Sequence, residues 1–137
     1  MLVDPIPFAL RKTLRSCAVA NPFIHVELTT KNIEKSKKFY GKLFDWQFET
    51  VPVGSSDTYT LIKVGGGTGG GMFQMEDAPP MWLSYVLVDD IKQTTEKAKV
   101  LGAKIYRENH EVPGMGWLSI LSDPEGAMLA LWQPKAS

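Results

Sequence analysis

The hydrophobic and polar positions from residue 22 onward predict a strand, then a helix, then three more strands. In the first stretch, apolar Ile24, Val26 and Leu28 alternate with polar His25 and Glu27, which is the period of two typical of a β-strand. Over residues 33–44 the apolar side chains recur every three to four positions, as on one face of an amphipathic helix. Strands are then expected near residues 46–51, 59–64 and 71–75, separated by turn-forming residues.

The same order of elements repeats in the second half of the chain. A strand is predicted at residues 82–88, a helix at 91–101, and strands near 104–108, 117–122 and 128–132. Five pairs of similar residues are separated by a constant 58 positions, which indicates two copies of one unit. They are Asn32 and Asp90, Ile33 and Ile91, Leu43 and Leu101, Phe48 and Tyr106, and Tyr59 and Trp117. Asn32 and Asp90 are suitable helix N-caps, because their side-chain oxygens accept hydrogen bonds from the first turn.

These elements predict an α+β protein made of two tandem βαβββ modules, at residues 22–76 and 82–137. A linker is expected at residues 77–81, where Pro79 and Pro80 interrupt strand pairing. Residues 1–21 form a separate N-terminal arm in this interpretation. Its charges follow its apolar stretch, which argues against a secretory signal. An organelle transit peptide stays an alternative to an arm that packs on the body or on a partner subunit.

Composition removes several classes of function. The chain has 15 Lys and Arg against 15 Asp and Glu, a net charge of zero, and no basic block suited to nucleic acid or an anionic membrane. No stretch approaches the length of a membrane span. A single cysteine, Cys17, cannot form an internal disulfide, and a cytoplasmic location is expected. Two histidines cannot build a three-histidine zinc site in one chain.

Two βαβββ units in one short chain resemble the vicinal oxygen chelate superfamily, which includes glyoxalase I, bleomycin-resistance proteins and extradiol dioxygenases. Two groups of residues, together spanning roughly 22–134, carry the resemblance to its glyoxalase-like branch. The first is His25-Val26-Glu27-Leu28, Asn32-Ile33, Ser36, Phe39-Tyr40, Leu43-Phe44 and Trp46. The second is Val112-Pro113-Gly114-Met115-Gly116-Trp117, Asp123-Pro124-Glu125-Gly126-Ala127 and Leu131-Trp132-Gln133-Pro134.

The resemblance implies that the two units curl their sheets around a cleft. Metal-using members place a histidine on the first strand of one or both units and a glutamate on the last strand. His25 matches one of these positions, whereas Leu83, Ala130 and Met72 occupy the others. A divalent metal needs about four donor groups, so it is disfavoured here and no cofactor is expected, although an unusual metal set stays open.

The strand that carries His25 and Glu27 directs both side chains to one face, since neighbours two apart point the same way. If that face lines the cleft, the pair is suited to acid–base chemistry or to binding a polar group of a ligand. An interior hydrogen bond without function is the competing interpretation. Five further residues are expected to bind the ligand: Gln74, Tyr85, Trp117, Met128 and Trp132.

Three functions remain open. The first is a protein that binds a small, partly apolar molecule in the cleft without the usual metal. The second is an enzyme of the superfamily, a lyase, isomerase or dioxygenase, that uses His25 and Glu27. The third is a dimeric interaction module whose cleft is filled by side chains. The resemblance also implies a homodimer.

Overall fold

Two βαβββ halves joined edge to edge form the computed structural model, which describes residues 21–55 and 57–136. The first half contains β1 (Phe23–Thr30), α2 (Ile33–Leu43), β2 (Gln47–Val53), β3 (Asp57–Lys63) and β4 (Gly70–Gln74). The second contains β5 (Met81–Leu87), α3 (Ile91–Val100), β6 (Lys104–Val112), β7 (Gly116–Ser122) and β8 (Met128–Pro134). The predicted arm, apart from its last residue, and Cys17 lie outside the described residues.

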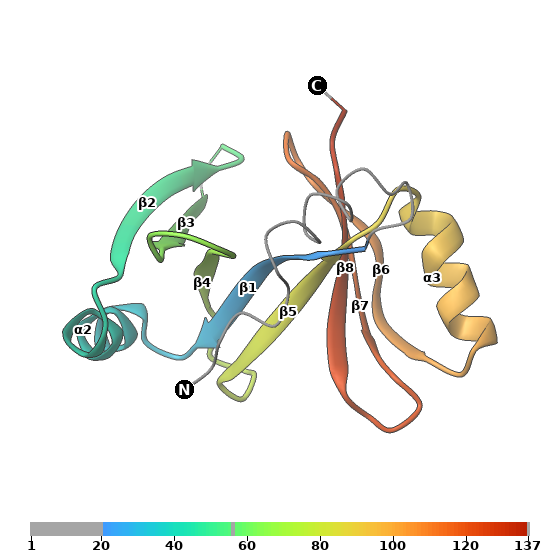
Figure 1. Ribbon diagram of the computed structural model, residues 1–137, viewed down its shortest axis with the longest axis horizontal. Helices are drawn as coiled ribbons and strands as arrows, with labels where there is room; N and C mark the ends of the chain where they lie inside the picture. Colours follow the sequence, from blue (N-terminus) through green and yellow to red (C-terminus); the bar gives the residue numbers. More distant parts are fainter. Residues whose placement is uncertain (1–20, 56, 137) are drawn as a thin grey trace, which may run out of the picture.

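The eight strands form one mixed sheet in the order β2-β3-β4-β1-β5-β8-β7-β6. Each half closes on itself, because its last strand pairs in parallel with its first: β4 with β1, and β8 with β5. The two halves meet where β1 pairs antiparallel with β5, which sets His25 opposite Tyr85 and Glu27 opposite Leu83. Helices α2 and α3 lie at opposite ends of the molecule (Figure 1). The predicted α+β fold is confirmed.

Both helices begin where their capping residues predict. The Asn32 side chain accepts a hydrogen bond from the Lys35 N–H, and the Asp90 side chain accepts one from the Gln93 N–H, each at 3.0 Å. A cap of this kind is worth about 1 kcal/mol to a helix. Neither helix is long and apolar enough to cross a bilayer, a finding that covers the described residues.

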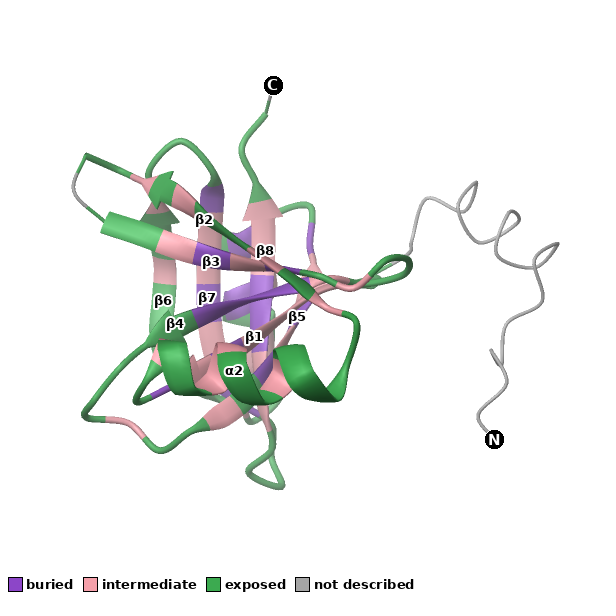
Figure 2. Cartoon of the chain, turned by 90° about the vertical axis from the view of Figure 1, so that its left-hand side faces the viewer, coloured by how far each residue is buried: buried purple, intermediate pink, exposed green. Residues whose placement is uncertain are grey.

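Apolar side chains pack on both faces of the sheet. On the helix side, Leu28, Ile62 and Met72 form the core of the first half, and Val88, Ile91, Leu121 and Leu131 form that of the second. Helix α3 buries Ile91 and Thr95, whereas α2 buries no residue fully and is largely exposed in Figure 2. On the opposite face, Leu83, Tyr85 and Ala130 form a third cluster. This third cluster forms part of the face that carries the candidate site.

The strand registers correct the constant 58-residue spacing of the repeat. Leu61 pairs with Gly71 in the first half, and Ile120 pairs with Ala130 in the second. Gly71 and Ala130 in turn pair with β1 and β5, the strands that open the two halves. The equivalent of Tyr59 is therefore Leu118, one residue beyond the Trp117 that the spacing predicts. Phe48 is likewise equivalent to Ile105 and not to Tyr106, since both pack against the helix-side cores.

Compared with β2 of the first half, β6 of the second half contains extra residues. Its pairing with β7 shifts register twice, between Ile105 and Arg107 and between Arg107 and His110, while the β2–β3 pairing shows no shift. Asn109 lies in the second irregularity with φ of 46°, in the left-handed region. Its N–H donates to the buried Ser119 hydroxyl at 2.9 Å. Each extra residue changes the spacing between equivalent residues of the two halves, so a constant 58 no longer identifies the equivalents after β6.

Candidate functional site

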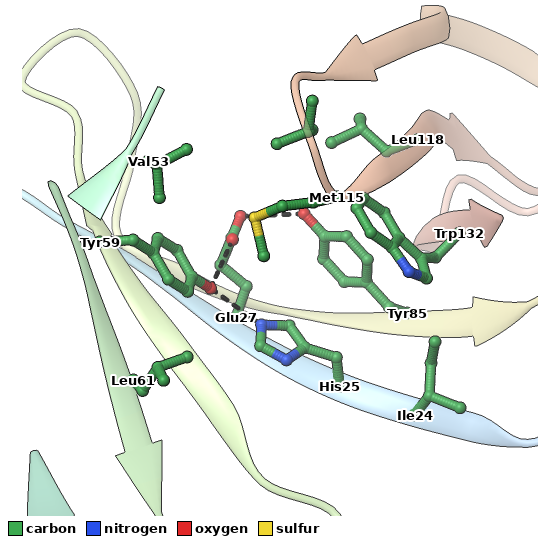
Figure 3. Close-up of a pocket in the computed structure, with 11 residues that line it drawn as sticks. Ile24, His25, Glu27, Val53, Tyr59, Leu61, Tyr85, Met115, Leu118 and Trp132 are labelled. Atoms are coloured by element: carbon green, nitrogen blue, oxygen red, sulfur yellow. Dashed lines mark hydrogen bonds between the residues drawn. The ribbon is translucent and has the colours of Figure 1, made fainter. Parts of the chain in front are cut away.

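A cavity of about 310 Å³ lies between the two halves, on the face of the sheet opposite the helix-side cores. That volume is at the lower end of the range usual for small-molecule sites. Both halves contribute to it, and its walls are mainly aliphatic and aromatic (Figure 3). The lining residues are Ile24, His25, Glu27, Val53, Tyr59, Leu61, Tyr85, Val112, Met115, Leu118 and Trp132.

The pleat of the strands directs these side chains into the cavity. His25 and Glu27 face it because they alternate along β1 with Leu28 and its neighbours on the core face. Ile24 also lines it, next to a register shift between Phe23 and His25. Tyr85 comes from β5, directly opposite His25. The cavity therefore lies across the central antiparallel pair of strands.

A chain of hydrogen bonds links the polar side chains of the cavity. The Tyr59 hydroxyl donates to Glu27 Oε1 at 2.9 Å, and the Tyr85 hydroxyl donates to Glu27 Oε2 at 3.1 Å. His25 Nε2 lies 2.8 Å from the same Tyr59 oxygen. Because the single Tyr59 proton is used on Glu27, His25 must donate through an Nε2–H, which assigns its tautomer and leaves Nδ1 as an acceptor.

Burial sets the protonation preferences of these groups. Loss of water raises the pKa of Glu27, and the hydrogen bonds from Tyr59 and Tyr85 oppose this by stabilising the carboxylate. Burial lowers the pKa of His25, which favours the neutral ring. Burial, followed by the nearby Glu27 charge, raises the pKa of both tyrosines. The site thus combines neutral hydroxyls and a neutral imidazole with one carboxyl group of perturbed acidity, the kind of group found at functional sites.

The positions that hold metal in the resembling family are poorly suited to metal here. His25 is the one donor among them, since Leu83 and Ala130 occupy two others. The prediction that Met72 occupies the fourth position was wrong. The strand register assigns this position to Gly71, the equivalent of Ala130, because Met72 is buried in the core on the other face. Within residues 21–55 and 57–136, no three or more His, Cys, Asp or Glu side chains lie close enough together to hold a metal ion. These residues do not fit a divalent ion.

Tyr59 fills the space beside Gly71. A Cβ atom added to Gly71 would collide with the Tyr59 ring and hydroxyl, so the glycine leaves room for the tyrosine. Tyr59 was not among the predicted site residues, although it bridges His25 and Glu27. The repeat pairs it with Trp117, which points to the opposite face, and only the strand registers show that its equivalent is Leu118.

Four predicted site residues come together in the cavity: His25, Glu27, Tyr85 and Trp132. Tyr85 contacts all three of the others: its hydroxyl donates to Glu27, and its ring lies edge-on to His25 at 5.3 Å between centroids and 6.5 Å from Trp132. Sequence reasoning found His25 and Glu27 from the alternation of one strand. It omitted the aliphatic wall, whose members read as ordinary core residues: Ile24, Val53, Leu61, Val112, Met115 and Leu118.

The structure places the three other predicted residues away from the cavity lining. The Gln74 side chain accepts a hydrogen bond from the Ile33 N–H at 3.0 Å, so it caps α2. Trp117 packs in the helix-side core of the second half. Met128 packs in the same cluster as Trp132 but lies four residues earlier on β8, outside the lining. Each side chain has a structural partner that accounts for its position.

Comparisons with known proteins match this architecture. The sequence model of the Glyoxalase/Bleomycin resistance protein/Dioxygenase superfamily matches residues 23–131. A Mycobacterium tuberculosis protein named "Putative glyoxylase CFP32" is 31% identical over 114 residues, which cover 79% of this chain and 44% of that protein. The anthracycline biosynthesis protein DnrV of Streptomyces peucetius is 24% identical over 126 residues, covering 78% and 45%. The chain thus spans less than half the length of these relatives.

Solved structures share the fold at low sequence identity. The hypothetical protein BH1468 of Bacillus halodurans superposes with a TM-score of 0.65 at 14% identity, over 86% of this chain and 97% of that one. Methylmalonyl-CoA epimerase of Mycobacterium tuberculosis gives a TM-score of 0.61 at 13% identity, over 83% and 88%. At such low identities the similarity shows the arrangement of strands and helices alone. The chemistry of the cavity must be inferred from its own residues.

Proposed function

Because the chain belongs to the glyoxalase/bleomycin resistance protein/dioxygenase superfamily, we propose that its cavity binds a small, partly apolar molecule without a divalent metal. The observation that carries this proposal is the cavity itself, open between the two halves and walled mainly by apolar side chains around Glu27. The poor fit of the four family metal positions supports binding without metal. A cavity of about 310 Å³ also argues against the third hypothesis, a cleft filled by side chains.

A neutral apolar probe tests this proposal directly. We expect 2-phenylethanol, titrated into EDTA-treated protein, to cause saturable NMR shifts at cavity residues such as Tyr85 and Leu118. Leu118→Trp, which fills the cavity, should abolish the shifts without lowering the melting temperature greatly. The matched control is Tyr106→Trp on the exposed side of β6, which should leave binding intact. Shifts that do not saturate, or that map to the helix-side cores, would contradict the proposal.

Acid–base catalysis is the second candidate, favoured by the raised pKa of Glu27 in an apolar cavity. In that case Glu27 would take a proton from a carbon acid and return a proton from water. Phenylacetone in D₂O tests this, because exchange of its benzylic protons above the buffer rate requires such a base. Glu27→Gln should stop the exchange, and His25→Ala should abolish it without unfolding the protein. The absence of a free hydroxyl or imidazole donor for the enolate oxygen places this function second.

A homodimer and a cytoplasmic location are part of the same proposal. Exposed aromatic residues near α2, including Phe39, Phe44 and Trp82, support association with a second copy. Light scattering should then give about twice the chain mass of 15.2 kDa, and a mass of one chain would contradict it. The single cysteine supports a reducing compartment.

A further inference from the structure

The polar groups that the cavity leaves free are almost all hydrogen-bond acceptors. Both tyrosine protons are used on Glu27, and the His25 N–H is used on Tyr59. A carboxylate has about four acceptor positions, of which these bonds occupy two. His25 Nδ1 adds another acceptor. Among the lining side chains, the indole N–H of Trp132 is the one donor for which the described residues provide no hydrogen bond. A ligand fits this set best if it offers a donor.

The charge of the cavity further defines that donor. Glu27 is the one carboxylate in the lining, and the described part of the chain contributes no lysine or arginine to it. None of the salt bridges among the described residues includes Glu27, and all of them lie elsewhere on the surface. The charge of Arg107 on β6 opposes the rise in the pKa of Tyr85, but Arg107 forms none of the described salt bridges with Glu27. A half-buried carboxylate without an ion-pair partner is unfavourable, and a positive ligand would offset its desolvation. A carboxylate or phosphate ligand would add a second negative charge and be repelled.

The surrounding rings suit a cation as well. Tyr59 and Tyr85 lie on either side of Glu27 in Figure 3, with Trp132 beyond Tyr85, and aromatic faces attract ammonium groups by about 0.5–2 kcal/mol. Leu61, Met115 and Leu118 also line the cavity and belong to the aliphatic wall, which offers surface to an apolar body. The cavity thus combines a carboxylate and aromatic rings with hydrocarbon surface for the rest of a ligand.

We infer that the ligand is an apolar molecule carrying a protonated amine, with its ammonium group at Glu27 and its body against the aliphatic wall. This inference rests on the proposed binding function and names the chemical class of its ligand. Neutral hydroxyl and amide donors are the closest competitors, because they also meet the free acceptors but do not neutralise the charge.

Three probes with one phenylalkyl body separate these classes by calorimetric titration: 2-phenylethylamine, 2-phenylethanol and 3-phenylpropanoate. We expect the amine to bind roughly tenfold or more tightly than the alcohol, because it forms a charge-assisted hydrogen bond. If the amine and the alcohol bind equally well, the proposed binding function stands but the inference of an amine ligand is overturned. The same holds if 3-phenylpropanoate binds most tightly. No binding by any probe would overturn both.

The variant Glu27→Gln tests whether the carboxylate is responsible. It should remove the advantage of the amine over the alcohol, measured as the ratio of the two affinities in the same variant. Glu34→Gln on the exposed surface of α2 is the matched control and should keep the full advantage. An advantage that persists in Glu27→Gln would overturn the assignment of the ammonium group to Glu27. If Glu27→Gln fails to fold, the pH profile of the wild-type protein decides. The affinity for the amine should fall as pH is lowered through the pKa of Glu27, while the affinity for the alcohol stays constant. An amine affinity that does not change with pH overturns the inference.

Discussion

At the scale of single residues, Glu27 is the group around which the site is organised. Two hydroxyls hold its carboxyl oxygens, and a third group, His25, reaches it through Tyr59. Burial raises its pKa despite these bonds. Such a position costs folding stability at neutral pH, which is typical of residues kept for binding or catalysis.

That cost predicts a pH-dependent effect of Glu27→Gln on the melting temperature. Because the folded pKa of Glu27 is raised, its protonated form favours folding, and this contribution is lost as pH rises through the folded pKa. The variant should therefore melt a few degrees above the wild type near neutral pH. The difference should disappear below the ordinary pKa of glutamate, where both proteins are uncharged at this position.

Glu34→Gln provides the comparison for this pH series, since Glu34 is exposed and should give a small difference at every pH. The other titratable groups near Glu27 are His25 from β1, Tyr59 from β3 and Tyr85 from β5, with the charge of Arg107 from β6 acting on Tyr85, and all are the same in both proteins. A Glu27→Gln protein that melts lower by the same amount at neutral and acidic pH would show that the carboxylate carries no burial cost.

The alternation of β1 placed His25 and Glu27 on one face, and the resemblance to the superfamily made His25 a candidate site residue. Tyr59 could not be identified in the same way, because its role depends on a glycine on a neighbouring strand and on the register between them. Gln74 and Trp117 illustrate the converse. Both residue types occur in ligand sites. Here the Gln74 side chain caps the N-terminus of α2, and Trp117 packs in the helix-side core.

At the scale of secondary structure, the repeat predicted the order of elements and the helix N-caps. It could not predict the two register shifts in β6, because a bulge depends on local hydrogen bonds and leaves no periodic pattern. Those shifts change the spacing between the two halves, so that Leu118, on the cavity face of β7, and not Trp117 is the equivalent of Tyr59. The equivalence of Gly71 with Ala130 follows from the same registers.

Ser119 is expected to stabilise this bulge. Its hydroxyl is fully buried, accepts from the Asn109 N–H and contacts the Thr95 hydroxyl, each at 2.9 Å. Ser119→Ala leaves both groups without their partner and should lower the free energy of unfolding by about 1–3 kcal/mol. Urea denaturation measures this. Ser84→Ala on β5 is the control; equal losses in the two variants would contradict the role of Ser119.

Gly71 and Tyr59 are expected to be energetically coupled. Gly71→Ala forces the Tyr59 ring to move and should cost about 1–3 kcal/mol of unfolding free energy, as overpacking does. In a Tyr59→Ala background the same substitution should cost little, because the ring is gone. A double-mutant cycle measures the difference.

Gly70 provides the control for this cycle. A Cβ atom there meets the backbone of Val26 and not Tyr59, so Gly70→Ala should be equally costly with and without the tyrosine ring. Independent costs of Gly71→Ala and Tyr59→Ala would mean that the glycine is not there to accommodate the tyrosine.

At the scale of the whole molecule, the duplicated pattern predicted an α+β fold of two βαβββ modules, and the resemblance to the superfamily implied one cleft between them. The content of the cleft depends on where the two copies differ. Glu27 and Tyr85 occupy equivalent positions on β1 and β5, and so do Val53 and Val112 at the ends of β2 and β6. One copy supplies the carboxylate and the other a hydroxyl that donates to it. The two copies therefore place different polar groups at equivalent positions of the cavity.

The central claim is that this cavity binds an apolar ammonium compound through Glu27 with no divalent metal. The most direct measurement is the calorimetric affinity of 2-phenylethylamine, determined once in EDTA and once with added Mn²⁺, Ni²⁺ or Zn²⁺. We predict saturable binding with one affinity in all of these solutions. Binding that requires the metal, or that becomes tenfold tighter when the metal is present, would contradict the account.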